Sequence, residues 1–252
     1  QKEFKVKMNF LKNSLGLLRD PDANSFFGWE IQLTQYSLML LPYVYAAKAG
    51  HILFSNEQSC DDLMIDKDGF KCNPVFEQSH QWLLQNSLMT SLVGGNSLSV
   101  GTLIEPLHDL AIIKILHYRY PEIGKYQSSC DHQTKSGMRW CESCSKCARI
   151  YILLLANGVN PKRVGFKGNL LRESKKYLFP TLSPERIQEF GYDNSESARN
   201  EQIYSFFLAY KKGVKGAAMD SFKKKYLKYA SEHEKIFRKK YFGIHSSTTV
   251  PY

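Results

Sequence analysis

Four cysteines that lie within eighteen residues constrain the fold of this 252-residue chain more than any other feature of its sequence. Cys130 is followed by Cys141, Cys144 and Cys147, so the run ends in two consecutive Cys-x2-Cys spacings. Tetrahedral zinc takes four ligands with Zn–S distances of about 2.3 Å, and short Cys-x2-Cys turns bring two thiolates to one ion. The spacing therefore predicts a closed zinc site, which is structural because no coordination position is open to substrate. An iron–sulfur cluster is the alternative.

The remaining cysteines and the apolar pattern indicate a cellular location. Cys60 and Cys72 are expected to be free thiols, since six cysteines are too few for a disulfide scaffold in a chain of this length. His132 offers a substitute metal ligand, but we expect it to be a loop residue. The longest apolar stretch, around 36–49, is too short and too interrupted for a membrane span, and no leader peptide is visible. We therefore expect a cytoplasmic protein with a reduced metal site.

Positive charge is concentrated near the end of the chain. The formal net charge is +10, and residues 211–240 hold eleven basic and three acidic side chains. Eleven minus three gives +8 for 211–240, which leaves +2 for the rest of the chain. Any binding of nucleic acid must therefore rest on 211–240 alone. Apolar and aromatic side chains recur there at helical spacing: Phe222, Tyr226, Tyr229, His233, Phe237 and Tyr241. This pattern predicts an amphipathic helix that docks on the core; an RNA, an acidic partner or an anionic membrane surface is the alternative use.

Helical and strand patterns alternate in the first two thirds of the chain, which predicts an α/β fold with a parallel sheet. A largely buried helix over 29–49 leads to a buried strand at 51–54, and polar residues follow that strand. A solvated loop over 60–75, with aspartates that do not match a calcium loop, comes next. Further elements are helices over 77–92, 109–118 and 149–156 and a strand over 99–104, with Pro106 in a first helical turn. We expect three regions: an N-terminal segment 1–28, an α/β domain with the zinc site at 29–166, and a helical basic region at 167–252.

Several polar side chains occupy positions where a site would form. Asn56 and Glu57 follow the first strand, where open parallel sheets bind ligands, although both would also serve as caps of the next turn. His80 at a helix start is a candidate for proton transfer, with a surface role as the alternative. Glu105 would contact substrate or stabilise a helix dipole. Lys146, between two of the cysteines, would reach a phosphate or stay solvated. His108 and His117 are expected on an ordinary helix surface.

The order of these features resembles the PP-loop ATP pyrophosphatase superfamily. Its member 7-cyano-7-deazaguanine synthase carries a Ser-Cys and then a Cys-x2-Cys-x2-Cys zinc site, and Ser129-Cys130 followed by the three later cysteines is similar to that pattern. The stretch 105–110, Glu-Pro-Leu-His-Asp-Leu, resembles the motif that opens the helix before the zinc site. This resemblance implies an adenine nucleotide alpha hydrolase-like fold.

A closer resemblance is to the epimerase of UDP-N-acetylmuramoyl-L-alanyl-L-glutamate. Its Asn-Glu strand end is similar to Asn56-Glu57, and its His-Gln-Trp helix start is similar to residues 80–82. Its Trp-Cys-x2-Cys-x-Lys-Cys run and its later Asn-Leu-Leu match residues 140–147 and 169–171. The likeness covers roughly 29–175. It implies catalytic roles for His80 and Glu57. It further implies binding of substrate or nucleotide by the following residues: Asn56, Gln81, Glu105 and Lys146.

The chain departs from the superfamily at the nucleotide site. The Ser-Gly-Gly-x-Asp-Ser loop that holds pyrophosphate in the superfamily does not occur here. Because the sequence starts at Gln1, we expect it to be the C-terminal half of the catalytic fold. The missing half would then lie upstream or on a companion subunit, and ATP and Mg²⁺ would bind only with it.

The resemblance implies that a small-molecule carboxylate is activated by ATP, which yields AMP and pyrophosphate. The epimerase would then invert the terminal L-glutamate of its substrate. One alternative is a 7-cyano-7-deazaguanine synthase-like or base-modifying enzyme. The other is a non-catalytic, zinc-stabilised module that binds RNA or a partner protein through its basic tail.

Overall fold

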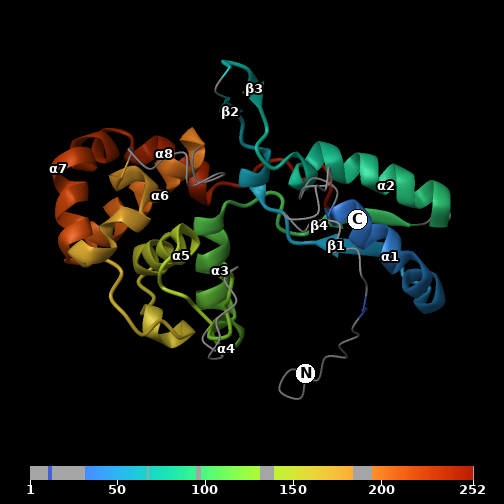
Figure 1. The fold of residues 1–252 in the computed structure, drawn as a ribbon, viewed down its shortest axis with the longest axis horizontal. Helices are drawn as coiled ribbons and strands as arrows, with labels where there is room; N and C mark the ends of the chain where they lie inside the picture. Colours follow the sequence, from blue (N-terminus) through green and yellow to red (C-terminus); the bar gives the residue numbers. More distant parts are fainter. Residues whose placement is uncertain are drawn as a thin grey trace, which may run out of the picture.

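The computed structural model describes residues 11–12, 32–66, 68–94, 98–130, 139–183 and 195–251, in two bodies that lie side by side along the longest axis (Figure 1). One body is an α/β unit near the N-terminus and the other is built of helices. The predicted N-terminal segment 1–28 lies almost wholly outside the described residues, as do the first residues of the predicted helix at 29–49.

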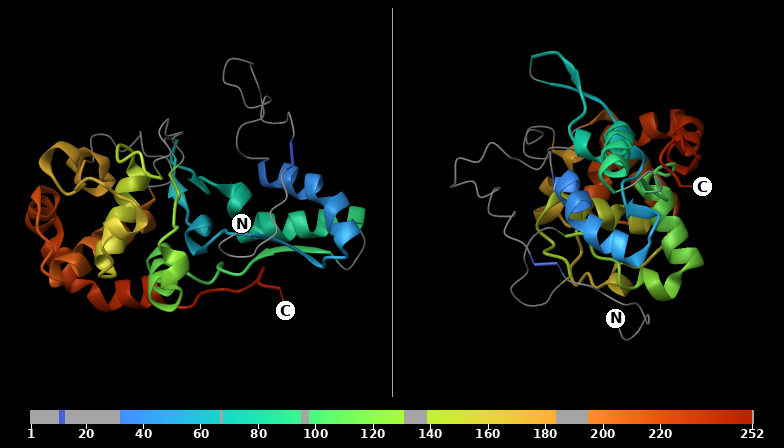
Figure 2. Two further views of the ribbon diagram at one scale, coloured as in Figure 1. Left: turned by 90° about the horizontal axis from the view of Figure 1, so that it is seen from below. Right: turned by 90° about the vertical axis from the view of Figure 1, so that its right-hand side faces the viewer.

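The α/β unit contains the predicted parallel sheet. Strands β1 (His51–Phe54) and β4 (Ser99–Thr102) pair in parallel and in register. Helix α1 (Gln32–Ala47) precedes β1, and helix α2 (His80–Gly94) connects β1 to β4. Both helices lie on the same side of the sheet (Figure 2). They enclose a small apolar cluster: Ile52, Trp82, Leu83, Leu98 and Val100. The sequence thus predicted both strands and their parallel order.

Helix α1 is much more exposed than predicted. Ser37 is its one buried residue, and Tyr45 is 81% exposed. On α2, Leu88 and Leu92 are 63% and 74% exposed, although the sequence placed both on an apolar helix face. The expectation of a largely buried helix was wrong because the described sheet has two strands. A sheet of that width covers only a narrow stripe of each helix.

The segment predicted as a solvated loop is ordered into short elements. It contains the strands β2 (Met64–Ile65) and β3 (Lys71–Cys72). The 3-10 helix η4 (Gln58–Asp61) overlaps its start, and the 3-10 helix η5 (Phe76–Gln78) follows its end. Strands β2 and β3 form an antiparallel hairpin that projects from the molecule (Figure 1). The Asp66 carboxylate accepts hydrogen bonds from two backbone N–H groups in its turn. This aspartate therefore shapes a hairpin.

The second body, here called the helical body, runs from helix α3 (Asp109–Arg119) to the end of the described chain. It comprises α4 (Pro121–Gly124), α5 (Ser145–Ala156), η6 (Pro161–Val164), η7 (Glu173–Leu178), η8 (Pro180–Leu182), α6 (Glu196–Lys211), α7 (Ala217–Glu232) and α8 (Glu234–Phe242). Nearly all of α5 is buried, as expected for a central helix. Its core is rich in aromatic rings: Trp140, Phe179, Tyr204, Phe206, Phe222, Phe237 and Tyr241. This core spans 166, so the predicted boundary there does not coincide with a division between the bodies.

The predicted basic helix docks on the core as expected, but it is two helices. Helices α7 and α8 meet at His233, which ends the first and precedes the second. Phe222, Phe237 and Tyr241 are buried in the large core, which confirms the docked face. Among the described helices, none combines the length and the apolar character that a bilayer crossing requires.

The C-terminal segment returns from α8 to the α/β unit and joins the two bodies (Figure 2). The N–H of His245 donates to the carbonyl of Pro106, and the N–H of Thr102 at the end of β4 donates to the carbonyl of Thr249. A Cβ at Gly101 would lie 2.0 Å from that carbonyl oxygen, so the close approach requires glycine. The junction is therefore built into the sequence of β4.

Candidate metal centre and active-site residues

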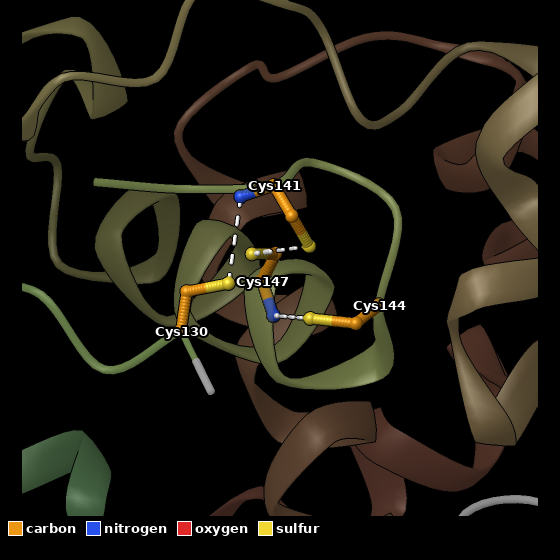
Figure 3. Close-up of side chains that lie close together, drawn as sticks. All are labelled: Cys130, Cys141, Cys144 and Cys147. Atoms are coloured by element: carbon orange, nitrogen blue, oxygen red, sulfur yellow. Dashed lines mark hydrogen bonds between the residues drawn. The ribbon is translucent and has the colours of Figure 1, made fainter. Parts of the chain in front are cut away.

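The four clustered cysteines come together as the sequence predicted. The sulfur atoms of Cys130, Cys141, Cys144 and Cys147 all lie within 4.8 Å of one another (Figure 3). The sulfurs of Cys141 and Cys147 are 3.7 Å apart. Four sulfurs in a tetrahedron about 2.3 Å from one ion would be separated by about 3.8 Å. The group could therefore hold a metal ion such as zinc, and all six cysteines of the chain are free thiols.

Backbone N–H groups surround the sulfurs and favour their thiolate form. The N–H of Cys141 points to the Cys130 sulfur, and the N–H of Cys147 points to the Cys144 sulfur, both at 3.4 Å. Cys144 is also the N-cap of α5, where the helix dipole favours negative charge. Hydrogen bonds, foremost from the Cys147 side chain, lower the pKa of Cys144 to about 5, and the same pairing raises the pKa of Cys147.

The metal loop is tied to the helical body from two sides. Trp140 is buried, stacks on Phe166 and donates its indole N–H to the carbonyl of Val164 at 2.8 Å. Glu142 adopts a left-handed backbone conformation, and its carboxylate accepts the N–H of Gly168 at 2.8 Å. These contacts position the cysteine turn at the start of α5.

The two residues predicted at the end of β1 differ in what they contact. Asn56 is buried, and its side-chain amide donates to the carbonyl of Gln78 at 2.9 Å. Its own carbonyl accepts the hydroxyl of Thr102 at 2.8 Å, so Asn56 joins the ends of β1, β4 and η5. Glu57 is the N-cap of η4 and accepts hydrogen bonds from the N–H and the hydroxyl of Ser59. Both therefore have the capping and joining roles that the sequence left open.

Glu57 also faces a charged cluster that the sequence analysis did not identify. The Arg149 guanidinium lies 3.0 Å from a carboxylate oxygen of Asp109 and 3.0 Å from one of Glu201. Burial raises the pKa of Glu57 well above its usual value, and Asp109 and Glu201 raise it further while Arg149 opposes them. Burial likewise raises the pKa of Glu201 to about 7. Two carboxylates thus pair with one guanidinium, and Glu57, just beyond the end of β1, lies within electrostatic range of all three groups.

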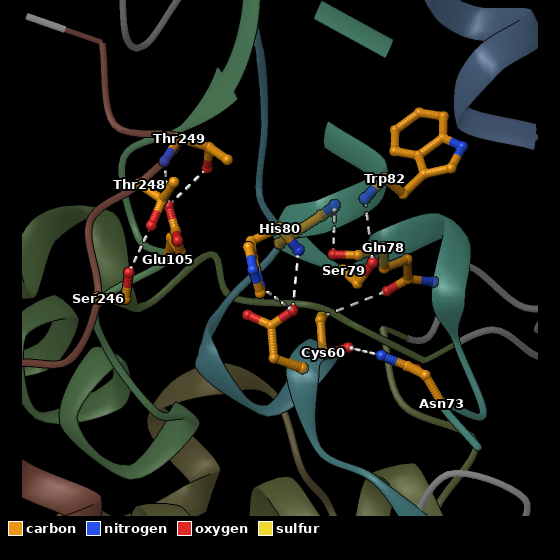
Figure 4. A network of polar contacts seen from close by, with 12 residues as sticks. Cys60, Asn73, Gln78, Ser79, His80, Trp82, Glu105, Ser246, Thr248 and Thr249 are labelled. Atoms are coloured by element: carbon orange, nitrogen blue, oxygen red, sulfur yellow. Dashed lines mark hydrogen bonds and ion pairs between the residues drawn. The ribbon is translucent and has the colours of Figure 1, made fainter. Parts of the chain in front are cut away.

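His80 begins α2, as predicted, and is oriented by an acidic partner. Its Nδ1 atom lies 2.8 Å from an oxygen of Asp61, and its backbone N–H donates to the same oxygen (Figure 4). The His80 side chain remains 45% exposed. Asp61 closes η4, the short helix that Glu57 caps, so both predicted catalytic residues lie around one element. The neighbouring Gln81 is exposed.

Glu105 contacts the C-terminal segment. It lies in a turn, and helix α3 starts only at Asp109, so the placement of Pro106 in a helical turn and the helix-dipole role of Glu105 were both wrong. One carboxylate oxygen of Glu105 accepts the N–H and the hydroxyl of Thr249 at 2.7 and 2.6 Å (Figure 4). The other is buried with no partner among the described residues. Glu105 therefore anchors the strap between the two bodies.

Four other predicted positions have different outcomes. His108 and His117 are buried, so their assignment to a helix surface was wrong. The His108 ring packs edge-to-face on Tyr241, and burial lowers the pKa of His108 to about 3. Lys146 is exposed on the first turn of α5, and its contact with phosphate stays a prediction. His132 lies outside the described residues.

One residue of the charged cluster, Arg149, had a weak signal in the sequence, and Glu201 had none. Arg149 is the one charged residue in the apolar run from 148 to 156, which is unusual for a helix that becomes central. Glu201 follows a polar helix start and had no such contrast. Its role depends on a contact across 52 residues of chain, which local spacing does not encode.

No protein-family model matches the chain, and neither a curated protein nor a solved structure is significantly similar to it.

Proposed function

We propose that the chain is the C-terminal part of an ATP-consuming enzyme of the PP-loop type that activates a substrate carboxylate. One observation carries the proposal: Glu57, just beyond the carboxyl end of β1, is half-buried and lies within electrostatic range of the cluster formed by Asp109, Arg149 and Glu201. Open parallel sheets bind ligands at this edge, and strongly perturbed carboxylates in such places are candidates for proton transfer. The resemblance to the epimerase supplies the substrate class, the terminal L-glutamate of UDP-N-acetylmuramoyl-L-alanyl-L-glutamate.

The proposed reaction has three steps. The substrate carboxylate attacks the α-phosphorus of ATP, which forms an acyl adenylate and releases pyrophosphate. The adenylate acidifies the neighbouring α-hydrogen, so that one group removes this proton and another returns a proton to the opposite face. Water then cleaves the adenylate to the inverted carboxylate and AMP.

The environments of the two proton-transfer groups support distinct roles. Burial favours the protonated form of Glu57, which therefore suits the group that returns the proton. His80 donates Nδ1–H to Asp61 in the tautomer that leaves Nε2 free as an acceptor, which suits the group that removes the proton. Asn56, Gln81 and Lys146 remain candidates for contacts with substrate or nucleotide.

Zinc is proposed as the ion held by the four cysteines, in a structural role. Its four sulfur ligands would fill the coordination sphere. Arg149 lies two residues after Cys147 on α5, so the metal would fix the helix start that bears the guanidinium. The metal centre would therefore hold the Arg149 guanidinium in place and take no part in the chemistry.

The nucleotide loop is proposed to lie on an ATP-binding half outside these 252 residues, either upstream or on a companion subunit. The exposed apolar side chains of the α/β unit support this: Leu53, Leu88 and Leu92 are 48–74% exposed. Further parallel strands beside β1 would widen the sheet and cover such side chains. ATP and Mg²⁺ would bind together with that half.

The test uses the full-length gene product with ATP, Mg²⁺ and UDP-N-acetylmuramoyl-L-alanyl-L-glutamate, and measures pyrophosphate release. Glu57→Gln keeps the side-chain size and removes the titratable proton. We expect it to lower formation of the D-glutamate product at least 100-fold. Glu122→Gln, on the exposed α4, is the matched control and should leave the rate unchanged. A Glu57→Gln variant with wild-type epimerisation would contradict the proposed role.

The non-catalytic module predicts a different result in the same experiment. The full-length protein would then release no pyrophosphate with this substrate or with a deazapurine carboxylate. It would instead bind RNA through 211–240, with an affinity that falls steeply as salt rises.

A further inference from the structure

A cavity on the helical body, lined by none of the residues of the strand-end site, has the charge of a phosphate-binding pocket. It measures about 600 Å³ and lies between α3, the end of α5, α6 and α8. Pockets of roughly 300–1,000 Å³ accommodate ligands of nucleotide or drug size. Four cationic side chains and one carboxylate line it: Lys114, Lys211, Lys212, Arg238 and Glu234.

The carboxylate neutralises only one of the four cations. Glu234 accepts a hydrogen bond from Lys211 at 2.8 Å, which pairs the end of α6 with the start of α8. Among the residues that the structure describes, Lys212 and Arg238 have no carboxylate within ion-pair distance. The ammonium of Lys114 lies 5.1 Å from the ring centre of Phe242. Three cations therefore face one cavity without a compensating anion.

The helix dipole explains only part of this charge. Lys211 and Lys212 lie at the C-terminal end of α6, where cations stabilise the exposed carbonyl groups. Lys114 is in the middle of α3, and Arg238 is in the middle of α8. Helix capping does not require a positive charge at either place. Their convergence on the cavity is a feature of the fold.

The Tyr204 side chain adds a hydrogen-bond donor to the same cavity. Tyr204 lines the cavity, is 1% exposed as a residue, and donates its hydroxyl to no described residue. Its hydroxyl is therefore available to a bound molecule. Burial, and then the Glu234 carboxylate, raise the pKa of Tyr204 while Arg238 opposes them, so the hydroxyl lies near both charges. It is a neutral donor next to the unpaired cations.

Aromatic side chains border the same cavity. Tyr118 is 65% exposed, and Phe242 lies on the opposite helix α8. Faces of this kind stack with planar bases, and arginine and lysine contact phosphate oxygens. A local pocket of this volume fits one nucleotide better than the long track of a nucleic-acid strand.

We infer that this cavity is a binding site for a nucleoside diphosphate or triphosphate. Lys114, Lys212 and Arg238 contact the phosphate oxygens, the Tyr204 hydroxyl donates to one of them, and Tyr118 or Phe242 stacks on the base. The inference does not rest on the proposed function, because the cavity shares no residue with the strand-end cluster around Glu57.

The test is calorimetric titration of the 252-residue chain with UDP and with ATP, since this chain lacks the superfamily's phosphate loop. The double substitution Lys212→Ala and Arg238→Ala should weaken binding at least tenfold. The control Lys224→Ala and Lys228→Ala removes the same charge from exposed positions of α7 and should change the affinity less than twofold. Tyr204→Phe removes only the hydroxyl and should weaken binding several-fold with unchanged thermal stability.

Two further ligands separate the contribution of the phosphates to the affinity from that of the nucleoside. Inorganic pyrophosphate should compete with UDP, and uridine should bind at least tenfold more weakly than UDP. Equal losses in the two double variants would show that net charge alone governs binding and would overturn the inference. A single-stranded twelve-nucleotide RNA that binds more tightly than either nucleotide would also overturn it, in favour of a nucleic-acid surface. Absence of nucleotide binding by the folded wild-type chain would contradict it directly.

Discussion

The two bodies of this molecule differ in how completely they bury their apolar side chains. In the helical body, Leu153, Leu154 and Phe206 have at most 1% of their surface exposed. In the α/β unit, helix α2 leaves Leu88 and Leu92 more than half exposed, and the sheet has two described strands. Isolated pairs of strands are marginally stable in water. The helical body therefore contains its own core, whereas the α/β unit leaves much of its apolar surface exposed.

The metal centre belongs to the self-contained body. Cys147 is completely buried in the large core, and the turn before it is held by Trp140 and Glu142. The α/β unit contributes Glu57, but the groups that perturb its pKa, Arg149 and Glu201, come from the helical body. The candidate active site thus lies where the helical body, with its closed core and four clustered cysteines, meets the more exposed α/β unit.

Removing the metal should unfold the helical body. We expect this change to have the largest effect on stability. Cys144→Ser deletes one of four ligands, and structural zinc sites contribute roughly 10–16 kcal/mol of apparent binding free energy, which is as large as a typical stability of about 5–15 kcal/mol. We expect loss of about one metal ion per chain and loss of near-ultraviolet circular dichroism. Cys72→Ser, on the hairpin, is the matched control. A folded Cys144→Ser protein with unchanged metal content would contradict the structural assignment.

Matched leucine truncations compare the two bodies directly. Leu154→Ala in α5 should cost about 2–5 kcal/mol because the removed side chain leaves a cavity in a closed core. Leu88→Ala in α2 should change the free energy of unfolding of this chain by less than about 0.5 kcal/mol, since the side chain is 63% exposed. Urea titration measures both. Similar costs for the two variants would show that the α/β unit is as closed as the helical body.

The buried histidine at the junction should make stability depend on pH. Burial, followed by His245, Lys240 and Arg149, lowers the pKa of His108 to about 3, against 6.5 in the unfolded chain. Between pH 3 and pH 6.5, His108 is therefore protonated in the unfolded state and neutral in the folded state. The contribution of His108 to stability is complete above pH 6.5 and falls by about 1.4 kcal/mol per pH unit below it.

Replacing this histidine isolates its contribution. His108→Gln should reduce the loss of stability between pH 7 and pH 5 by about 2 kcal/mol, measured by urea unfolding at both pH values. Glu201 acts in the opposite sense, because its raised pKa lowers stability as pH rises through 4.5 to about 7. The contribution of Glu201 is the same in the wild type and in His108→Gln, so it cancels in the comparison. Identical pH profiles for wild type and His108→Gln would show that His108 titrates normally.

Weakening the strap that joins the two bodies should have only a small effect on total stability. Thr249→Val keeps the N–H contact with Glu105 and removes the hydroxyl contact, which should cost about 1–2 kcal/mol. Thr248→Val changes an exposed neighbour and is the control. Fluorescence of Trp82 reports on the α/β unit and that of Trp140 on the helical body. We expect the two unfolding transitions to separate in Thr249→Val; transitions that stay coincident would show that the strap does not couple the bodies.

The sequence was sufficient to predict the features that depend on residues close together in the chain. Two Cys-x2-Cys turns fixed three of the four clustered sulfurs, and short apolar runs bounded by glycine and polar residues fixed β1 and β4. Asn56 and Glu57 were found because they follow a strand directly. The hairpin at 64–72 was missed because each of its strands has only two residues, too few to show alternation.

Features that depend on chain return could not be predicted in this way. Arg149 meets Glu201 across 52 residues, and Glu105 meets Thr249 across 144. His108 is buried because the C-terminal segment passes over it, and a helix pattern around 109–118 contains no record of that segment. The exposure of α1 could not be predicted either. Its sequence has the apolar content of a buried helix, but whether other elements cover a helix depends on the rest of the fold.

The central claim is that Glu57, beside the charged cluster, returns a proton to the α-carbon of an ATP-activated carboxylate after His80 has removed the α-hydrogen. Deuterium incorporation tests it most directly: the full-length gene product is incubated in D₂O with UDP-N-acetylmuramoyl-L-alanyl-L-glutamate, Mg²⁺ and ATP, and the glutamyl α-carbon is analysed by mass spectrometry. The account predicts one deuterium per inverted glutamate, strict dependence on ATP, and at least a 100-fold loss in Glu57→Gln. ATP-independent incorporation, or none by a folded, metal-loaded protein, would contradict it.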